Sequence, residues 1–313
     1  MKIIVTGGAG FVGSHLVELL VKKKHFPIIV DNLNSGLYSN IKHFVDAKKA
    51  KFIKSDIRDF KKIMQLPKVD AVIHLAAIAS VVESINNPIF VNDVNVNGTL
   101  NILEFCRKKK IKKLVFTSSA AIYGNYEKKI TEKTPTIPTT VYGSTKLTGE
   151  QYCKIYSNLF GINITSLRPF NIYGPRQNDA YAGVISKFMD KLNENKSPII
   201  FGNGKQTRDF IHVDDVARAF YYALKFKKTK FAVFNLATGK STSINELAKI
   251  FLSVTKKLNV KPIHKKPISG VVIHNSTNPI KIKQHLDFIS SINLTNGITN
   301  FVNYRSSWLF YQF

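Results

Sequence analysis

The stretch "IVTGGAGFVGSH", residues 4–15, decides the fold, because a short apolar run leads through a glycine-rich loop into an amphipathic segment. Gly7, Gly10 and Gly13 recur at every third position, and Gly8 with Gly10 and Gly13 also gives the pattern G-x-G-x-x-G. Small residues let the backbone turn tightly and approach a pyrophosphate, whose charge then lies at the helix N-terminus. A strand before such a loop and a helix after it are the context that a dinucleotide-binding loop requires.

A second apolar run, residues 27–30, is followed by Asp31, roughly twenty residues after the glycine loop. An acid at this place accepts hydrogen bonds from the adenosine ribose hydroxyls and repels a 2′-phosphate, so we expect NAD rather than NADP. Asp56, after the third predicted strand, either borders the adenine or caps the next helix. A glycine turn that binds nothing is the alternative to this interpretation.

Short apolar runs alternate with amphipathic ones over the first two-thirds of the chain. This order predicts an α/β protein with a doubly wound parallel sheet, the Rossmann fold. The predicted strands cover residues 2–5, 27–30, 51–54, 70–75, 112–116 and 162–167, and the predicted helices cover residues 11–24, 88–109 and about 140–160.

From residue 168 onward the pattern is less regular. Helices are predicted near residues 181–195, 213–226 and 243–257, and short strands around 199–201 and 232–236. We expect an NAD-binding Rossmann domain at residues 1–167 and a smaller C-terminal α/β substrate lobe at residues 168–313, some segments of which return to the first domain. The sequence after Lys261 gives no clear pattern.

The composition fits a soluble globular protein and bears on its partners. The 313 residues have a formal net charge of +26, but lysine is spread along the whole chain and arginine is scarce. Arginine binds bases and phosphates better than lysine does, so we expect a solvated surface and no nucleic-acid partner. The positive field of this surface helps to collect an anionic substrate. No stretch is long and apolar enough for a membrane span or a signal peptide, and Cys106 and Cys153 have no metal-ligand spacing. We therefore expect a cytoplasmic protein without a metal or a membrane partner.

The stretch "YGSTK", residues 142–146, places a tyrosine and a lysine four residues apart, on one face of a helix. Two further pairs, Tyr38/Lys42 and Tyr221/Lys225, have the same spacing. In a chain with 46 lysine and arginine residues such pairs arise by chance, so the spacing alone does not identify a proton-transfer site.

Several short motifs together favour the first of these pairs. They are "TGGAGFVG", "DNLNSG", "HLAA", "FTSSAAIYG", "YGSTK", "RPFNIYGPRQ" and "TRDFIHVDDVARA". In this order they resemble the extended short-chain dehydrogenases/reductases, and within them the NAD-dependent nucleotide-sugar epimerase/dehydratase family, nearest to the UDP-glucose 4-epimerases. The resemblance covers about residues 1–260.

The resemblance implies a catalytic set of Ser119, Tyr142 and Lys146. Tyr142 would remove a proton from a sugar hydroxyl, Ser119 would hydrogen-bond the oxygen that is oxidised, and Lys146 would also hold the nicotinamide ribose. A free tyrosine has a pKa near 10 and is a poor base at neutral pH. We expect the Lys146 ammonium and the positive nicotinamide to lower this pKa by about three units, which needs roughly 4 kcal/mol.

The resemblance also implies contacts with NAD and with the substrate. The expected NAD-binding residues are Gly7, Gly10, Phe11, Val12, Gly13, Asp31, Asn32, Asp56, Ile57, Leu75, Ala76, Ala77, Tyr142 and Lys146. The expected substrate-binding residues are Ser119, Tyr142, Asn171, Val184 and Arg208. Asn171 and Arg208 match residues that hold the nucleotide diphosphate, for which a planar guanidinium is suited; an exposed ion-pair partner is the alternative for Arg208. Asp209, Asp214 and Asp215 are expected to serve turns and helix caps.

The resemblance implies epimerisation of a nucleotide sugar at C4, UDP-glucose or UDP-galactose, through a transient 4-keto intermediate. Dehydratases that resemble this family carry an Asp-Glu pair after the Ser or Thr. Here those positions are Ala120 and Ala121, which cannot transfer protons. A dehydratase, a keto-reductase or dehydrogenase, and a non-catalytic NAD-binding protein with an RNA partner stay open as alternatives.

One segment departs from the family pattern. Relatives carry an Arg-Pro-Gly-Asp-like segment near the C-terminus, whereas this chain has "KKPISGVVIHN", which starts at Lys265. Gly270 is kept, but Val271 stands where an acid is expected and cannot accept a ribose hydrogen bond. Lys265 or Lys266 is available to replace the arginine. The nucleotide, and whether Asn275 admits acetamido sugars, therefore stay open.

In the family that the chain resembles, two helices of each subunit form a four-helix dimer interface, here residues 88–109 and 142–160. The second helix has more apolar side chains than one packed face uses. They are Leu147, Tyr152, Ile155, Tyr156 and Leu159. We expect a C2 homodimer that buries the second apolar stripe; packing on the sheet of its own subunit is the alternative.

Overall fold

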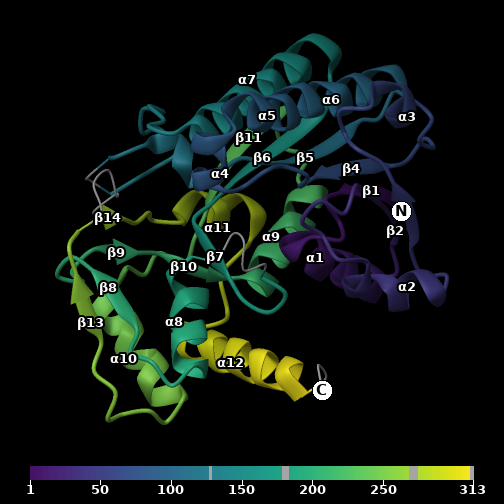
Figure 1. Ribbon diagram of the computed structural model, residues 1–313. Coiled ribbons are helices and arrows are strands. Elements are labelled where there is room, and N and C mark those ends of the chain that lie inside the picture. Colours follow the sequence, from purple (N-terminus) through teal and green to yellow (C-terminus); the bar gives the residue numbers. More distant parts are fainter. Residues whose placement is uncertain (127–128, 178–182, 268–273, 311–313) are drawn as a thin grey trace.

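The computed structural model describes residues 1–126, 129–177, 183–267 and 274–310 (Figure 1). Among these residues, seven parallel strands form the main sheet in the order β11-β6-β5-β4-β1-β2-β3. Their bounds are β1 Lys2–Thr6, β2 Phe26–Asp31, β3 Lys51–Lys54, β4 Ala71–His74, β5 Lys113–Thr117, β6 Asn163–Pro169 and β11 Phe231–Leu236. The predicted doubly wound parallel sheet is confirmed.

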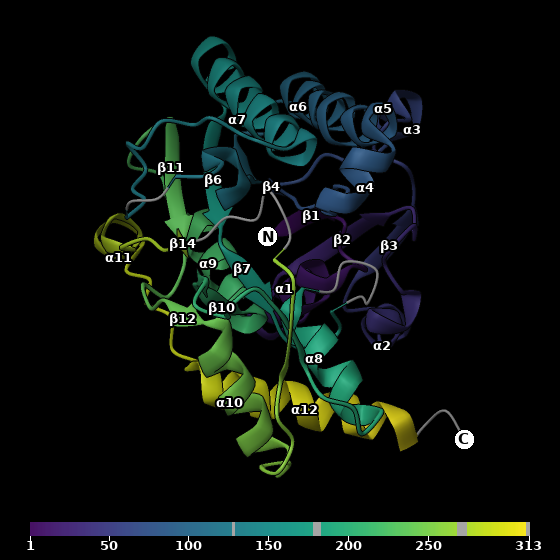
Figure 2. The same ribbon diagram turned by 60° about the vertical axis from the view of Figure 1, so that its left-hand side comes forward.

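Helices cover both faces of this sheet (Figure 2). One face carries α1 Phe11–Lys22, α2 Lys42–Asp46, α9 Val213–Lys225 and α11 Ile280–Leu286, and the other carries α3 Phe60–Met64, α5 Pro88–Asn92, α6 Gly98–Lys108 and α7 Val141–Phe160. Side chains alternate along each strand, so Ile3 and Val5 of β1 enter the first core and Ile4 enters the second. No helix in the described part of the chain is sufficiently long and apolar to cross a membrane.

The region predicted as one helix at residues 88–109 is interrupted. Between α5 and α6 lies a π-helical turn, η2 Asp93–Asn97. Short helical segments also precede α5 and follow β5, namely α4 Val81–Asn86 and η3 Ala120–Tyr123, and η1 Tyr38–Asn40 precedes α2.

A smaller lobe follows β6 and has its own apolar core. Its elements are β7 Asn171–Tyr173, α8 Val184–Asn193, β8 Ile199–Phe201, β9 Thr207–Arg208, β10 Phe210–His212, β12 Thr242–Ser243, α10 Ile244–Val254, β13 Ile263–Lys265, β14 His274–Asn275 and α12 Leu294–Phe310. Phe188, Phe251 and Phe301 pack together in this core. In Figure 1, α8, α10 and α12 lie together on one side of the main sheet.

Parts of the second half return to the main sheet. The helix α9 packs against α1, β11 pairs with β6 at the edge of the sheet, and α11 contacts β11. The sequence after Lys261, in which no pattern was visible, divides its apolar residues between two places. Ile282 joins the core under α1, whereas Ile298 joins the core of the lobe.

Candidate active site

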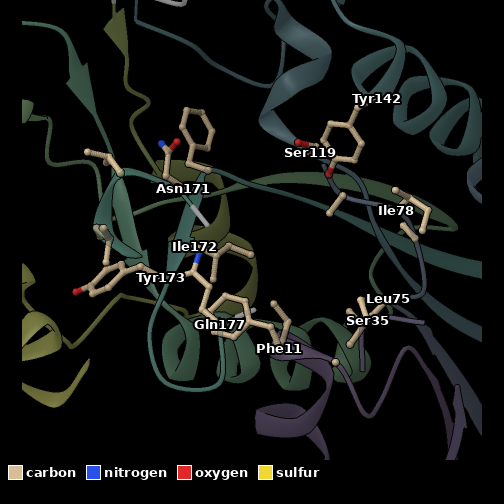
Figure 3. A pocket seen from close by; sticks show the side chains of 18 of the residues that line it. Phe11, Ser35, Leu75, Ile78, Ser119, Tyr142, Asn171, Ile172, Tyr173 and Gln177 are labelled. Atoms are coloured by element: carbon tan, nitrogen blue, oxygen red, sulfur yellow. The ribbon is translucent and has the colours of Figure 1, made fainter. Parts of the chain in front are cut away.

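A cavity of about 1090 Å³ lies between the carboxyl ends of the main strands and the smaller lobe (Figure 3). One wall comes from the residues after β1, β2, β3, β4 and β5, and the other from β7, α8, β8 and β9. The carboxyl ends of parallel strands are where open α/β sheets bind ligands. All residues expected to contact NAD or substrate line this cavity except Lys146, which is buried.

The glycine loop between β1 and α1 forms a cradle without side chains. Gly7 has a φ of +69°, and a Cβ there would lie 2.8 Å from the backbone nitrogen of Ala76. A Cβ on Gly13 would lie 2.1 Å from the carbonyl oxygen of Gly7. Gly10 precedes α1 and provides no side-chain cap, so the first N–H groups of the helix face no capping side chain. The cradle therefore fits the pyrophosphate of a dinucleotide.

Asp31 ends β2 and is joined to the glycine loop. One carboxylate oxygen accepts a hydrogen bond from the N–H of Ala9 at 3.0 Å, and the other from the N–H of Leu33 at 2.9 Å. Burial raises the pKa of Asp31, and the two N–H donors oppose that rise. An acid held in this way at the cavity wall offers lone pairs to a ribose diol and disfavours a 2′-phosphate, which is the property that selects NAD.

Asp56 lines the cavity and does not cap α3. The cap is Asp59, whose carboxylate accepts a hydrogen bond from the N–H of Lys62. Asp56 instead accepts from the Arg58 guanidinium at 3.0 Å and from Asn32 Nδ2 at 2.9 Å. The Arg58 hydrogen bond is the main cause that lowers the pKa of Asp56 to about 2. Of the two roles that the sequence left open, the geometry favours the border of the adenosine site.

Ser119 and Tyr142 come from different elements and meet at the cavity wall (Figure 3). Ser119 caps η3, and its Oγ accepts a hydrogen bond from the N–H of Ala121 at 3.1 Å. Tyr142 lies in the first turn of α7, two residues after the cap Thr140. The Tyr142 hydroxyl lies beside the Ser119 side chain, whose hydrogen-bonding interaction opposes the rise of the phenol pKa caused by burial. This arrangement can exchange a proton with a hydroxyl group in the cavity.

Lys146 lies one turn further along α7 and is buried. Its Nζ is 4.8 Å from the centre of the Phe116 ring, and burial lowers its pKa to about 8. Burial raises the pKa of Tyr142, and the hydrogen bond with Ser119 lowers it by less. The chain by itself therefore does not produce the lowered phenol pKa expected from the sequence, because desolvation disfavours the phenolate.

The other two tyrosine–lysine pairs lie away from the cavity. Tyr38 packs on Phe52 with ring centres 5.2 Å apart, and its partner Lys42 forms an ion pair with Asp46. In the third pair, the lysine Nζ is 4.3 Å from the centre of the Tyr221 ring, which is a cation–π contact on α9. Neither pair lines the cavity, in contrast to Tyr142.

A buried histidine supports the loop after β4, and the sequence indicated no role for it. His74 Nδ1 lies 2.7 Å from Thr6 Oγ1, and its Nε2 lies 3.1 Å from Thr99 Oγ1. Burial lowers the pKa of His74 to about 3, so the ring is neutral at neutral pH. Thr6 Oγ1 also accepts the N–H of Ala76 at 3.2 Å, beside the glycine cradle. The motif "HLAA" contains this histidine, but no local signal connects it with Thr6 or Thr99.

The lobe side of the cavity carries Asn171 and Arg208. Asn171 opens β7, and its Nδ2 donates to the carbonyl oxygen of Asp209 at 2.9 Å. Arg208 lies next to Asp209, in β9, and is half-buried. The Asp209 carboxylate accepts the N–H of Thr238 at 2.8 Å, which agrees with the predicted role in a turn. The backbone around Asp209 thus presents both predicted diphosphate contacts to one wall.

Further cavity residues were not assigned a contact from the sequence. They include Asn34, Ser35, Ile78, Ala79, Phe90, Phe170, Tyr173 and Gln177. Most lie in loops or in strands of two or three residues, where no periodic pattern exists. Some residues that the sequence singled out are not described, namely Gly270, Val271 and the side chain of Asn275.

Neither lysine that was available to replace the missing arginine lines the cavity in the described structure. Lys265 and Lys266 are exposed and do not line the cavity, although β13, which contains Lys265, pairs with β8. The cations among the described lining residues are Lys205 and Arg208, both from the lobe.

Residues 3–237 match the sequence profile described as the NAD dependent epimerase/dehydratase family. The chain belongs to this family. Membership confirms the predicted family and makes NAD the cofactor. The matched residues of this epimerase/dehydratase include the glycine loop, Tyr142 and Arg208.

Two curated relatives cover nearly the whole epimerase/dehydratase chain. A putative UDP-glucose 4-epimerase of Methanocaldococcus jannaschii is 44% identical over 311 residues, which are 97% of this chain and 98% of that protein. A UDP-glucuronate 4-epimerase of Thermodesulfobacterium geofontis is 34% identical, over 96% of this chain and 95% of its own.

Solved structures give the same result. The UDP-glucose 4-epimerase of Thermotoga maritima, crystallised with UDP-glucose, has a TM-score of 0.93 at 35% identity and covers 99% of this chain and 100% of its own. The UDP-N-acetylglucosamine 4-epimerase of Methanobrevibacter ruminantium, in complex with UDP-N-acetylmuramic acid, has a TM-score of 0.92 at 32% identity and covers 98% of each chain. These relatives share one reaction and differ in the sugar. The predicted class, a nucleotide-sugar 4-epimerase and hence an isomerase, is confirmed at that level.

Proposed function

We propose that this epimerase interconverts UDP-glucose and UDP-galactose by NAD-dependent inversion at C4. The observation that carries the proposal is the placement of Ser119 and Tyr142 side by side at the wall of the cavity that also contains the glycine cradle. The reaction requires a base for a sugar hydroxyl and a bound dinucleotide within reach of the same sugar.

Tyr142 removes the proton of the C4 hydroxyl, and Ser119 hydrogen-bonds the same oxygen. The glycine cradle and Asp31 would hold NAD, which would supply a reversible hydride acceptor for C4. The sugar in between is a 4-keto sugar, and its rotation in the cavity exposes the opposite face. Burial opposes the phenolate of Tyr142, and the ammonium of Lys146, one turn further along α7, would be a positive charge that favours it.

The residues after Ser119 argue against a dehydratase. Elimination of water needs an additional acid and base. Ala120 and Ala121 hold the positions expected for them, at the start of η3, and neither lines the cavity. Their methyl groups carry no proton that can be transferred.

The charges of the described cavity wall favour a neutral hexose. Lys205 and Arg208 come from the lobe, where a diphosphate would be bound by cations. The opposite wall carries the neutral side chains of Ser119, Tyr142 and Ala79, and its two carboxylates, Asp31 and Asp56, lie at the expected adenosine site. A hexuronate brings one more carboxylate to the sugar end, and a buried carboxylate without a cation is disfavoured.

The test is an incubation of purified protein with UDP-galactose and no added reductant. UDP-glucose should appear until the two sugars reach equilibrium, which proton NMR follows directly. Parallel incubations with UDP-glucuronate and UDP-N-acetylglucosamine identify the sugar, and turnover of either one alone would replace the proposed substrate. Accumulation of NADH equal to the substrate consumed, or loss of water, would contradict the epimerase reaction itself.

The protein is also proposed to form a homodimer through α6 and α7. Ile155 and Leu159 of α7 are 46% and 70% exposed, and Ile89 of the neighbouring α5 is 85% exposed. Three of the apolar residues expected at the interface instead pack within their own subunit, namely Leu147, Tyr152 and Tyr156. The stripe that supports a dimer is therefore narrower than the sequence indicated.

A further inference from the structure

Arg168 and Glu150 form a buried ion pair behind the catalytic side chains. Arg168 on β6 is 6% exposed and Glu150 on α7 is 4% exposed. The guanidinium donates to both carboxylate oxygens, with Nε 3.1 Å from Oε2. Ser166 Oγ, also on β6, donates to the same Oε2 at 2.9 Å. These bonds fix α7 to the strand beside it.

The same guanidinium reaches the turn that follows Ser119. Arg168 Nη1 donates to the hydroxyl of Tyr123 at 2.6 Å, and that hydroxyl donates to Asn235 Oδ1 at 2.7 Å. Tyr123 is the last residue of η3, which begins directly after Ser119. One arginine therefore connects the turn that positions Ser119 with the helix that positions Tyr142.

Glu150 also places a negative charge near Lys146. It follows Lys146 by four residues, on the same face of α7. The other groups that act on Lys146 are the ring of Phe116 on β5, the thiol of Cys153 on α7 and the neutral imidazole of His74 on β4. Burial raises the pKa of Cys153 far above neutral pH, so its thiol is uncharged and Glu150 is the anion that favours the ammonium.

A role in stability alone does not explain this arrangement. Desolvation of two buried charges offsets their attraction, and apolar residues of the same volume often stabilise a core equally well. We infer that the Arg168–Glu150 pair is a positioning element of the active site, which fixes α7 against β6 and η3 and so holds Tyr142 and Lys146 in register with Ser119. The inference rests on the proposed function, because it assigns a role in that reaction.

The first test replaces the planar guanidinium of Arg168 and keeps its positive charge. Arg168→Lys cannot bridge Glu150 and Tyr123 with one planar group, so α7 is less firmly placed. A misplacement of reacting groups by about 1 Å costs around 100-fold in rate, so kcat with UDP-galactose should fall about tenfold to 100-fold. KM and the amount of bound NAD should change little, because the cavity wall is kept.

The second test removes the charge and keeps the shape. In Glu150→Gln the ammonium of Lys146 loses its nearby anion, so the pKa of Lys146 should fall below the wild-type value. NMR titration of ¹³C-lysine-labelled, NAD-bound protein measures this pKa without any turnover. The alkaline limb of the kcat profile should move to lower pH in Glu150→Gln and stay in place in Arg168→Lys, a difference that a merely structural role does not produce.

The matched control is Arg218→Lys. Arg218 also pairs with a buried carboxylate, that of Asp215, but on α9. The Arg218→Lys variant should leave both kcat and the pKa of Lys146 unchanged. If Arg168→Lys or Glu150→Gln does not fold, Tyr123→Phe removes a single hydroxyl and should lower kcat in the same direction.

Three results would overturn the inference. They are a wild-type kcat in Arg168→Lys, a loss of kcat in Arg218→Lys as large as that in Arg168→Lys, and an unchanged Lys146 titration in Glu150→Gln. If the wild-type protein turned over no nucleotide sugar, the proposed function would fail, whereas the Lys146 titration would still decide whether Glu150 acts on Lys146.

Discussion

The hydroxyl of Tyr142 lies beside Ser119 at the cavity wall, and its removal deletes the proposed base without changing the backbone of α7. Tyr142→Phe should lower kcat with UDP-galactose by about 10²- to 10⁴-fold, the usual contribution of a general base, while NAD stays bound. Steady-state assays and the NAD content of the purified variant measure both effects. Tyr38→Phe is the matched control, because Tyr38 has the same lysine spacing but packs on Phe52. Inactive Tyr38→Phe beside fully active Tyr142→Phe would show that the wrong pair was chosen.

Lys113 shows a different consequence of burial, at the opposite end of β5 from Ser119. Its Nζ donates to Asn163 Oδ1 at 2.7 Å, Thr165 Oγ1 at 2.8 Å and the carbonyl oxygen of Phe226 at 2.7 Å. None of these acceptors is charged, and burial lowers the pKa of Lys113 to about 7. In the unfolded chain a lysine has a pKa of about 10.4.

Between these two pKa values the unfolded state binds a proton that the folded state has lost. The contribution of Lys113 to the free energy of unfolding is therefore lowest below pH 7 and rises with pH. Relative to Lys113→Met, the wild-type protein should gain up to about 4 kcal/mol between pH 7 and pH 10. Urea unfolding of both proteins at the two pH values measures the gain. If the difference in the free energy of unfolding between wild type and Lys113→Met stayed constant or shrank with rising pH, Lys113 would not be a buried charge without an anionic partner.

Among the elements, those formed by local patterns were predictable and those fixed by distant contacts were not. Each predicted strand of the main sheet coincides with an observed strand, because buried parallel strands are uniformly apolar. The predicted helix at residues 88–109 instead contains the π-turn η2, which no periodicity reveals. Its cause is tertiary, since the turn places the side chain of Asn95 between two other segments.

Asn95 provides the test of this turn. Its Oδ1 accepts the N–H of Ile78 at 2.8 Å, and its Nδ2 donates to the Ile78 carbonyl oxygen and to Thr145 Oγ1, both at 3.0 Å. Asn95→Ala leaves buried backbone groups unpaired and should lower the free energy of unfolding by about 1–3 kcal/mol. Urea unfolding measures it. Asn97→Ala, on the same turn, is the control, because Asn97 is exposed and bonds to Asp93 within its own helix. If both variants lost the same free energy of unfolding, the hydrogen bonds of Asn95 to Ile78 and Thr145 would not be the cause of the loss.

For the whole molecule, the glycine cradle and the lobe mark the two limits of prediction from sequence. The cradle lies within one short stretch and so was visible, together with Asp31 that follows it. The lobe pairs strands of two or three residues that are far apart in the chain, such as β8 with β13 and β9 with β14. The sequence therefore did not assign a contact to a cavity residue such as Gln177, whose place depends on these distant pairings.

The dimer is the prediction that belongs to this scale. Light scattering at micromolar concentration should give twice the 35.3 kDa of one chain. Replacing the exposed pair Ile155 and Leu159 by lysine should yield monomers, because charges on both sides of a two-fold interface repel. Leu258→Lys is the control, since Leu258 is 74% exposed in the loop after α10. A wild-type monomer with full activity would contradict the dimer.

The edge strand β11 comes late in the chain, and this position has a consequence for biosynthesis. This edge strand leaves the ribosome only after the residues of the lobe that precede it, and so does α9, which covers the face formed by Leu16 and Val17. At about 5–20 residues per second, translation leaves β6 without one neighbour for several seconds. During that time the nascent chain exposes an apolar face and an open strand edge, the features that promote aggregation and recruit chaperones. The main sheet is therefore completed only after most of the lobe has been synthesised.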